Sequence, residues 1–177
     1  MRLHPGEPAP EFTATDTEGR PVDLAALRGS KVWLTFFRYA ACPLCSYRIH
    51  ELLAQWDQRF AGREFSLITI WQSQPQRLAE VEQRYSPSFS LVPDPQMHLY
   101  HLYGVEKGIA KVLGKGVFSQ LAAARKVGID VLRAWEGPAT RRPADFLIGA
   151  DGIIHTAFYG ENVGDMIPFE QVEAFLG

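Results

Sequence analysis

Apolar and polar positions along the 177-residue chain alternate between short continuous apolar runs and amphipathic segments. Continuous apolar runs at residues 31–37 and 65–71 are typical of strands buried on both faces of a sheet. The segment that begins at Pro43 instead repeats apolar residues at helical spacing, with charged residues on its other faces. Pro43 suits the first helical position, where its missing N–H group costs nothing. We expect this helix to end at Gly62.

The remaining elements follow from the same periodicity and from turn residues. Short strands are predicted at residues 11–15, 20–23, 88–92, 146–148 and 153–159. Helices are predicted at residues 75–85, 96–103, 117–127 and 168–176, and one helical turn at 24–27. The order is β-β-β-α-β-α-β-α, an insertion, then β-β-α. This order indicates an α/β fold with parallel crossovers and an antiparallel C-terminal edge.

Residues 104–142 form the least regular stretch of the chain. Between positions 106 and 136, six Lys or Arg residues face three acidic residues, so the stretch is mildly basic. We interpret it as an insertion within a single domain that spans residues 1–177. A solvated helix that covers the sheet is the first interpretation, and a lid or a homodimer contact is the alternative.

Composition narrows the class of protein. A hydrophobic content of 46% and a charged content of 21% are ordinary for a soluble globular protein. The net charge of −2 gives no reason to expect nucleic acid or an anionic membrane as a partner. The N-terminus lacks the apolar region of a secretory signal, and no apolar run is long enough to span a membrane. We therefore expect a cytoplasmic protein, in which a lone cysteine pair is more often catalytic than structural.

The two cysteines of the chain, Cys42 and Cys45, form a C-x-x-C motif between a predicted strand and a predicted helix. At a helix N-terminus, unpaired N–H groups and the helix dipole favour the Cys42 thiolate, which is the nucleophilic form. Cys45 follows one turn later, within disulfide reach. Two alternatives stay open: buried structural cysteines, or half of a zinc site. The nearest histidine pair, His98 and His101, lies far downstream at too short a spacing for a zinc motif.

With this motif at a strand-to-helix turn, the chain resembles the thioredoxin superfamily. It is most similar to the peroxiredoxin-like branch, the alkyl hydroperoxide reductase/thiol-specific antioxidant group. The markers of that branch occur in order along nearly the whole chain: residues 8–12 with Asp16-x-x-Gly19, residues 37–45, residues 91–94 and 103–105, and residues 143–152 with 157–160. The resemblance implies a thioredoxin-like fold, with a mixed central sheet flanked by helices. It also implies an N-terminal β-hairpin extension and an insertion before the C-terminal β-hairpin.

Two positions depart from the peroxidatic pattern of that branch. Peroxidatic members carry Pro-x-x-x-Thr-x-x-Cys, where this chain has Thr35 and Tyr39. They also tend to carry an Arg three residues before the Phe of the Phe-Leu-Ile strand, where this chain has Pro143, preceded by Arg142. In thioredoxin-like disulfide reductases a cis-proline stands there, beside the dithiol. The resemblance therefore implies a thioredoxin-like dithiol in a peroxiredoxin-like frame, with a cis Arg142–Pro143 bond.

We assign roles on this basis. Cys42 is the predicted nucleophile and Cys45 the resolving thiol. Arg38 is expected to lower the pKa of Cys42, and Arg142 is a second candidate for that role, although both could be surface arginines. The resemblance implies that Pro143 holds the backbone close to an incoming disulfide.

Tyr39 and Trp71 are predicted to line an apolar rim that binds substrate, with core packing as the equal alternative. The predicted function is a thiol-dependent oxidoreductase that reduces peroxides, disulfides or both, with an antioxidant role. It needs no metal or organic cofactor, and a thioredoxin-like or glutathione-type reductant restores it. Because the peroxidatic Thr and Arg are missing, we expect slow peroxide reduction and at least comparable disulfide exchange. The alternative is a non-enzymatic redox-sensing or binding domain whose cysteine pair switches a partner surface, with residues 104–142 as the reporter.

Overall fold

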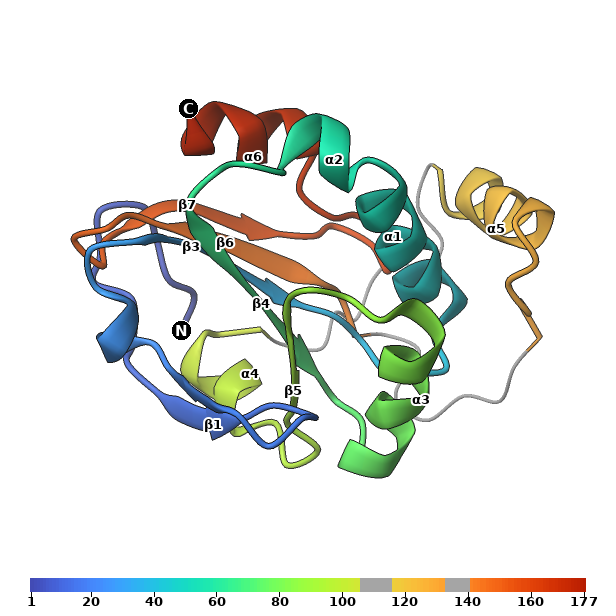
Figure 1. Cartoon of the computed structure of the whole chain (residues 1–177), viewed down its shortest axis with the longest axis horizontal. Coiled ribbons are helices and arrows are strands. Elements are labelled where there is room, and N and C mark those ends of the chain that lie inside the picture. The colour runs from blue at the N-terminus through green and yellow to red at the C-terminus, as the bar shows by residue number, and fades with distance from the viewer. Residues whose placement is uncertain (106–115, 133–140) are drawn as a thin grey trace.

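The computed structural model describes residues 1–105, 116–132 and 141–177. Its centre is a five-stranded sheet of order β5-β4-β3-β6-β7 (Figure 1). The central strand β3 is parallel to β4 and antiparallel to β6. Beyond them, β5 is parallel to β4, and β7 is antiparallel to β6. The predicted α/β fold with parallel crossovers and an antiparallel C-terminal edge is therefore confirmed. The strands are β3 (Lys31–Phe36), β4 (Phe65–Trp71), β5 (Ser90–Pro93), β6 (Ala144–Ile148) and β7 (Ile154–Tyr159).

Helices cover both faces of this sheet, so its central strands β3 and β6 are buried on both sides. In Figure 1, α1, α2 and α6 lie above the sheet, whereas α4 and a small hairpin lie below it. The helices are α1 (Pro43–Ala54), α2 (Trp56–Arg59), α3 (Pro75–Tyr85), α4 (His98–Leu102), α5 (Val117–Lys126) and α6 (Phe169–Leu176). The hairpin joins β1 (Thr13–Thr15) to β2 (Pro21–Asp23) and is followed by the 3₁₀ turn η1 (Ala25–Leu27). None of the helices in the described ranges is long and apolar enough to cross a membrane.

A hydrophobic core lies on each face of the sheet. The strand β3 contributes side chains to both cores, because alternate side chains of a strand point to opposite faces. Trp33 packs in the core under α1 and α6, while Leu34 and Phe36 pack in the core on the α4 side. This arrangement explains the continuous apolar run in the sequence.

The long helix predicted from Pro43 to Gly62 is broken into α1 and α2. Gln55 leaves helical geometry with φ −109° and ψ 2°. The break accompanies aromatic packing: Phe60 is buried, and its ring centroid lies 5.8 Å from that of Trp33. Helical spacing could not reveal this turn, because the apolar stripe continues across it.

The predicted helix at 117–127 is confirmed as α5. Residues 106–115 and 133–140 of the predicted insertion lie outside the described residues. The assignment of one domain with an insertion at 104–142 therefore stays a prediction.

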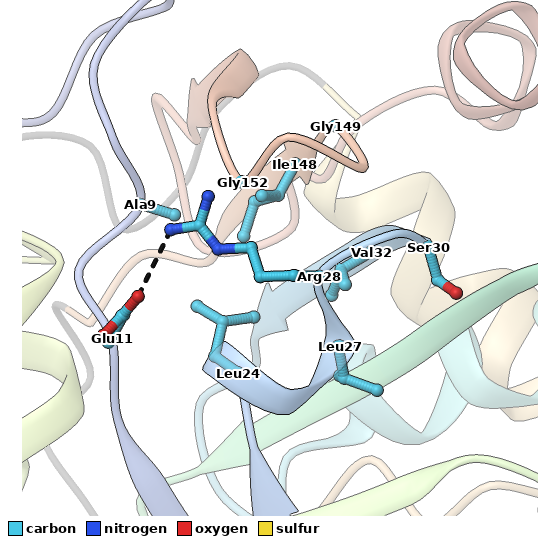
Figure 2. A pocket seen from close by; sticks show the side chains of 10 residues that line it. All are labelled: Ala9, Glu11, Leu24, Leu27, Arg28, Ser30, Val32, Ile148, Gly149 and Gly152. Carbon is cyan, nitrogen blue, oxygen red and sulfur yellow. Dashed lines mark hydrogen bonds and ion pairs between the residues drawn. The ribbon is translucent and has the colours of Figure 1, made fainter.

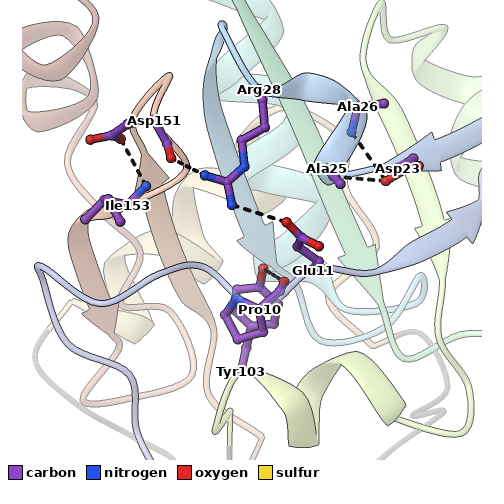
Figure 3. A network of polar contacts seen from close by, with 9 residues as sticks. All are labelled: Pro10, Glu11, Asp23, Ala25, Ala26, Arg28, Tyr103, Asp151 and Ile153. Atoms are coloured by element: carbon purple, nitrogen blue, oxygen red, sulfur yellow. Dashed lines mark hydrogen bonds and ion pairs between the residues drawn. The ribbon is translucent and has the colours of Figure 1, made fainter.

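Arg28 ties the N-terminal segment to the β6–β7 turn (Figure 3). Its Nη2 lies 3.2 Å from Glu11 Oε1, and its guanidinium donates to the Asp151 carbonyl. Gly152 adopts φ +76°, and a Cβ there would collide with the Arg28 side chain. The small pocket around Arg28 (Figure 2) holds about 10 Å³, room for about one water molecule, so it is not a substrate site.

Replacing Phe146 by alanine should destabilise the fold strongly. Phe146 is fully buried on β6, and its ring contacts those of Phe36, Tyr103 and Tyr159. We expect Phe146→Ala to lower the free energy of unfolding by about 3–5 kcal/mol, measured by urea denaturation. Phe118→Ala is the matched control: Phe118 is 68% exposed on α5, so its loss should change stability by less than about 0.5 kcal/mol. Equal losses in the two variants would contradict the assignment of the core.

Candidate active site

The C-x-x-C motif forms the first turn of α1, directly after the loop that leaves β3. Cys42 is the N-cap residue with extended backbone (φ −72°, ψ 117°), and Pro43 occupies the first helical turn as predicted. The backbone N–H of Cys45 donates to Cys42 Sγ over 3.4 Å. Both cysteines are free thiols with no exposed surface. The helix therefore begins on the sulfur of Cys42, which replaces the oxygen of a usual N-cap side chain.

Arg38 contacts both sulfur atoms from the loop before the motif. Its Nη1 lies 3.4 Å from Cys42 Sγ, and its backbone N–H donates to Cys45 Sγ, also over 3.4 Å. Its Nη2 donates to the Tyr39 hydroxyl over 3.2 Å, and its guanidinium lies 4.9 Å from the centre of that ring. Arg38 is only 3% exposed. Its positive charge therefore acts on the thiols at short range and with little screening by water.

This environment separates the acidities of the two thiols. Burial would raise the pKa of Cys42, but hydrogen bonding from the Cys45 thiol and the charge of Arg38 lower it to about 7. The backbone N–H groups of Cys45 and Leu44 contribute to this lowering. Burial raises the pKa of Cys45 well above its usual value, and the neighbouring Cys42 sulfur adds to this effect. Near neutral pH, Cys42 is therefore the more readily ionised thiol, and Cys45 keeps its proton.

Hydrogen bonds to the end of β4 hold the loop that carries Arg38. The Gln72 backbone N–H donates to the Arg38 carbonyl over 3.0 Å. The Ala40 backbone N–H donates to Ser73 Oγ over 2.8 Å. The position of the guanidinium therefore depends on a strand that lies beside β3 in the sheet.

Tyr39 and Trp71, the predicted substrate rim, lie inside the protein. Tyr39 is 2% exposed and contacts Arg38. Trp71 is 1% exposed, stacks on Phe37 with ring centroids 4.4 Å apart, and donates from Nε1 to Thr69 Oγ1. Core packing describes their positions in this structure, and contact with substrate stays a prediction.

The expected cis peptide bond before Pro143 is wrong: the described residues contain no cis peptide bond. Pro143 instead continues β6 in extended form, and its carbonyl accepts from the Gly160 N–H over 3.0 Å, which prolongs the β6–β7 ladder. Arg142 is half-buried and lines a small pocket with Pro143, Arg2 and Tyr159. The structure thus brings Arg38, Cys42 and Cys45 together, whereas Arg142 and Pro143 line a small pocket whose lining includes neither cysteine.

Two buried charged residues were missed by the sequence analysis. Asp145 on β6 is 1% exposed and accepts from Trp33 Nε1 over 3.0 Å and from the Ile167 N–H over 3.1 Å. Burial raises the pKa of Asp145, and the charge of Arg48 on α1 opposes this effect. Arg141, directly before the predicted Arg142, is also 1% exposed. The available signal was an acidic residue within an apolar strand, since such residues are buried only when they have partners.

Neither cysteine lines the groove that lies over β2, β4 and β5. This groove, of about 590 Å³, is lined by residues of β2, β4 and β5 and by Trp56. In the described part of the chain, no group of three or more His, Cys, Asp or Glu side chains is placed to hold a metal ion. The groups that meet at this site are the two thiols and Arg38.

Comparison with known proteins gives a consistent result. Rv2521 of Mycobacterium tuberculosis H37Rv, which carries a provisional peroxiredoxin name, is 29% identical over 116 residues, 66% of this chain and 73% of that protein. The crystal structure of peroxidoxin BcpB from M. tuberculosis superposes with a TM-score of 0.69 at 19% identity, covering 99% of this chain and 97% of the other. The thioredoxin domain of a thiol-disulfide oxidoreductase from Bacteroides vulgatus gives a TM-score of 0.57 at 17% identity, covering 99% of each chain.

The two structural likenesses show the fold, which is the thioredoxin-like fold that the sequence predicted. The model of the AhpC/TSA family matches residues 5–157, most of the chain. The fold, the order of the sequence markers and this family match agree with one another. The chain therefore belongs to the AhpC/TSA family of peroxiredoxin-like proteins, whose relatives carry out thiol-dependent redox chemistry.

Proposed function

We propose that the protein is a thiol peroxidase in which Cys42 attacks a hydroperoxide and Cys45 resolves the product. The observation that carries this proposal is the contact between the Arg38 guanidinium and Cys42 Sγ in the buried first turn of α1. A cation fixed on the sulfur keeps the thiolate populated near neutral pH, where the reaction must run.

The first step is displacement at the O–O bond. The Cys42 thiolate attacks one peroxide oxygen, the O–O bond breaks, and the second oxygen leaves as an alkoxide or hydroxide that takes up a proton. The product on the protein is Cys42 sulfenic acid. Arg38 is the group that can stabilise the negative charge as it moves from sulfur to the leaving oxygen. It could therefore supply part of what the absent Thr and Arg of peroxidatic relatives would provide.

The second step forms the disulfide. The sulfur of Cys45 attacks the sulfenic sulfur of Cys42, the S–O bond breaks, and water leaves with the Cys45 proton. An external dithiol then reduces the Cys42–Cys45 disulfide and is itself oxidised. We infer a thioredoxin-like or glutathione-type reductant in the cytoplasm and an antioxidant role. A homodimer stays a prediction.

Disulfide exchange is the second candidate activity, because the C-x-x-C motif at a helix start suits it equally well. Two observations favour peroxide. The bond before Pro143 is trans, and both sulfurs lack exposed surface, which admits a small peroxide more readily than a protein disulfide. A redox sensor is the non-enzymatic alternative, and it would stop after one equivalent of oxidant, whereas an enzyme cycles with excess reductant.

Replacing Arg38 should raise the pKa of Cys42. In Arg38→Met, burial is no longer opposed by the guanidinium, so we expect the pKa to rise from about 7 by about two units. The rate of alkylation rises with pH through the thiolate pKa, so at pH 7 the variant should react about 10- to 100-fold more slowly. The measurement is the pH profile of Cys42 labelling, followed by peptide mapping. In the parent protein Cys42 should be labelled before Cys45.

Arg59→Met is the control for this experiment, because Arg59 pairs with Glu170 and Glu173 and its loss removes an arginine without touching the thiols. Its labelling profile should match that of the parent. A larger effect of Arg142→Met than of Arg38→Met would transfer the role to Arg142.

Oxidation should produce an intramolecular disulfide without a covalent dimer. Cys45 lies one helical turn from Cys42, and the chain has no third cysteine. Mild hydrogen peroxide should remove both free thiols and leave a monomer on non-reducing gels. Cys45→Ser should instead accumulate the sulfenic acid, detected by dimedone labelling. A covalent dimer as the main product of the parent protein would place resolution between subunits.

Hydrogen peroxide should oxidise the reduced protein faster than a folded protein disulfide does. Access to buried sulfurs favours the small oxidant, although the missing Thr should keep the rate below that of dedicated peroxidases. Stopped-flow tryptophan fluorescence on the reduced protein measures both reactions, with Cys42→Ser as the blank. Faster oxidation by the disulfide would make disulfide exchange the principal activity.

A further inference from the structure

Arg141 links two segments of the chain, the residue that follows β4 and the stretch around α4 from Met97 to Val105. It lies three residues before β6 and is 1% exposed. Its Nη1 donates to the Val105 carbonyl over 2.9 Å, its Nη2 to Met97 Sδ over 2.7 Å, and its Nε to Gln72 Oε1 over 3.3 Å. The guanidinium also lies 5.1 Å from the centre of the Tyr100 ring. Each of the three guanidinium nitrogens therefore has a partner on one of these two segments.

Two of these partners hold the loop that presents Arg38. The backbone N–H of Gln72 donates to the Arg38 carbonyl over 3.0 Å. The hydroxyl of Tyr100 donates to the Phe37 carbonyl over 2.7 Å, with the Ile70 carbonyl farther away at 3.1 Å. Both routes end on consecutive backbone carbonyls, one of which belongs to Arg38 itself.

We propose that Arg141 is a positioning residue for the dithiol, which acts through Gln72 and Tyr100 to hold the loop at residues 37–38 and so keep the Arg38 guanidinium on Cys42. This role deepens the proposed function, since it identifies what maintains the activating contact. The partners of Arg141 do not include the sulfur of Cys42 or Cys45, so it is not a catalytic residue.

An arginine at position 141 suits a positioning role better than a purely packing role. A buried guanidinium is costly to desolvate, and an apolar side chain of similar volume is often as stable. What arginine adds is a planar set of donors that fixes several partners in direction. The charged and titratable groups that act on Arg141 are Tyr100 and Asp94, and those that act on Cys42 are Arg38 and Cys45. No titration of Arg141 itself is invoked.

The test is the Cys42 pKa of the full-length reduced protein, measured from the ultraviolet absorbance of the thiolate against pH. In Arg141→Met we expect the pKa to rise by about one unit, which means about tenfold less thiolate at pH 6. Alkylation should slow by a similar factor at pH 6 and should return to the parent rate well above pH 9. A loss that merely reflects partial unfolding would not show this convergence.

Two tyrosines provide a matched pair of variants. Tyr100 and Tyr103 are both fully buried in the same core, but the Tyr103 hydroxyl donates to the Pro10 carbonyl (Figure 3) and not to a carbonyl of the loop. Tyr100→Phe should raise the Cys42 pKa in the same direction as Arg141→Met, and Tyr103→Phe should leave it unchanged. Combining Arg141→Met with Tyr100→Phe should give less than the sum of the single shifts, because both act on one loop.

An unchanged Cys42 pKa in folded Arg141→Met, or equal shifts in the two tyrosine variants, would overturn the proposal. If Arg141→Met does not fold, Arg141→Lys and Tyr100→Phe carry the same test, since lysine keeps the charge but lacks the planar donors. The pKa is measured without any substrate. Failure of the parent protein to turn over peroxide would therefore count against the proposed function and leave this comparison intact.

Discussion

The guanidinium of Arg38 is a buried positive charge, and the groups around the dithiol replace the water that it has lost. A cation with so little exposure is tolerated only where partners replace the lost water. The Cys42 sulfur, the Tyr39 hydroxyl and ring, and the packed loop supply that replacement. Thiolate and cation stabilise each other, so the reactive state of the sulfur is also the state in which the arginine is best accommodated.

The burial of Arg38 beside the dithiol also explains why the pKa values of the two thiols differ. Cys42 receives the guanidinium, the first helical N–H groups and the Cys45 thiol, all of which favour negative charge. Cys45 has its backbone one turn inside the helix, where burial dominates and keeps the sulfur protonated. Position within a single helical turn thus separates the acidities of the two thiols, on which the proposed roles depend.

Much of this could be predicted from the sequence. The buried strands at 31–37 and 65–71 and the dithiol at the start of a helix are local patterns, and local patterns survive folding. The trans bond before Pro143 could not be foreseen, because a motif match cannot report whether that residue continues a strand ladder. Arg141 was missed because its four partners lie in two segments that are distant from it along the chain. Contacts of that kind are created by the tertiary fold, and no spacing along the chain encodes them.

The burial of Arg38 has a thermodynamic consequence for the proposed cycle. When Cys42 and Cys45 join in a disulfide, the sulfur loses its negative charge while the guanidinium keeps its own. The oxidised protein would then hold an interior cation whose best partner has become neutral. Stabilising the thiolate therefore favours the reduced form and moves the reduction potential of the couple to a less negative value. The contact that activates the sulfur toward an oxidant would also make the resulting disulfide easier for the cellular reductant to open.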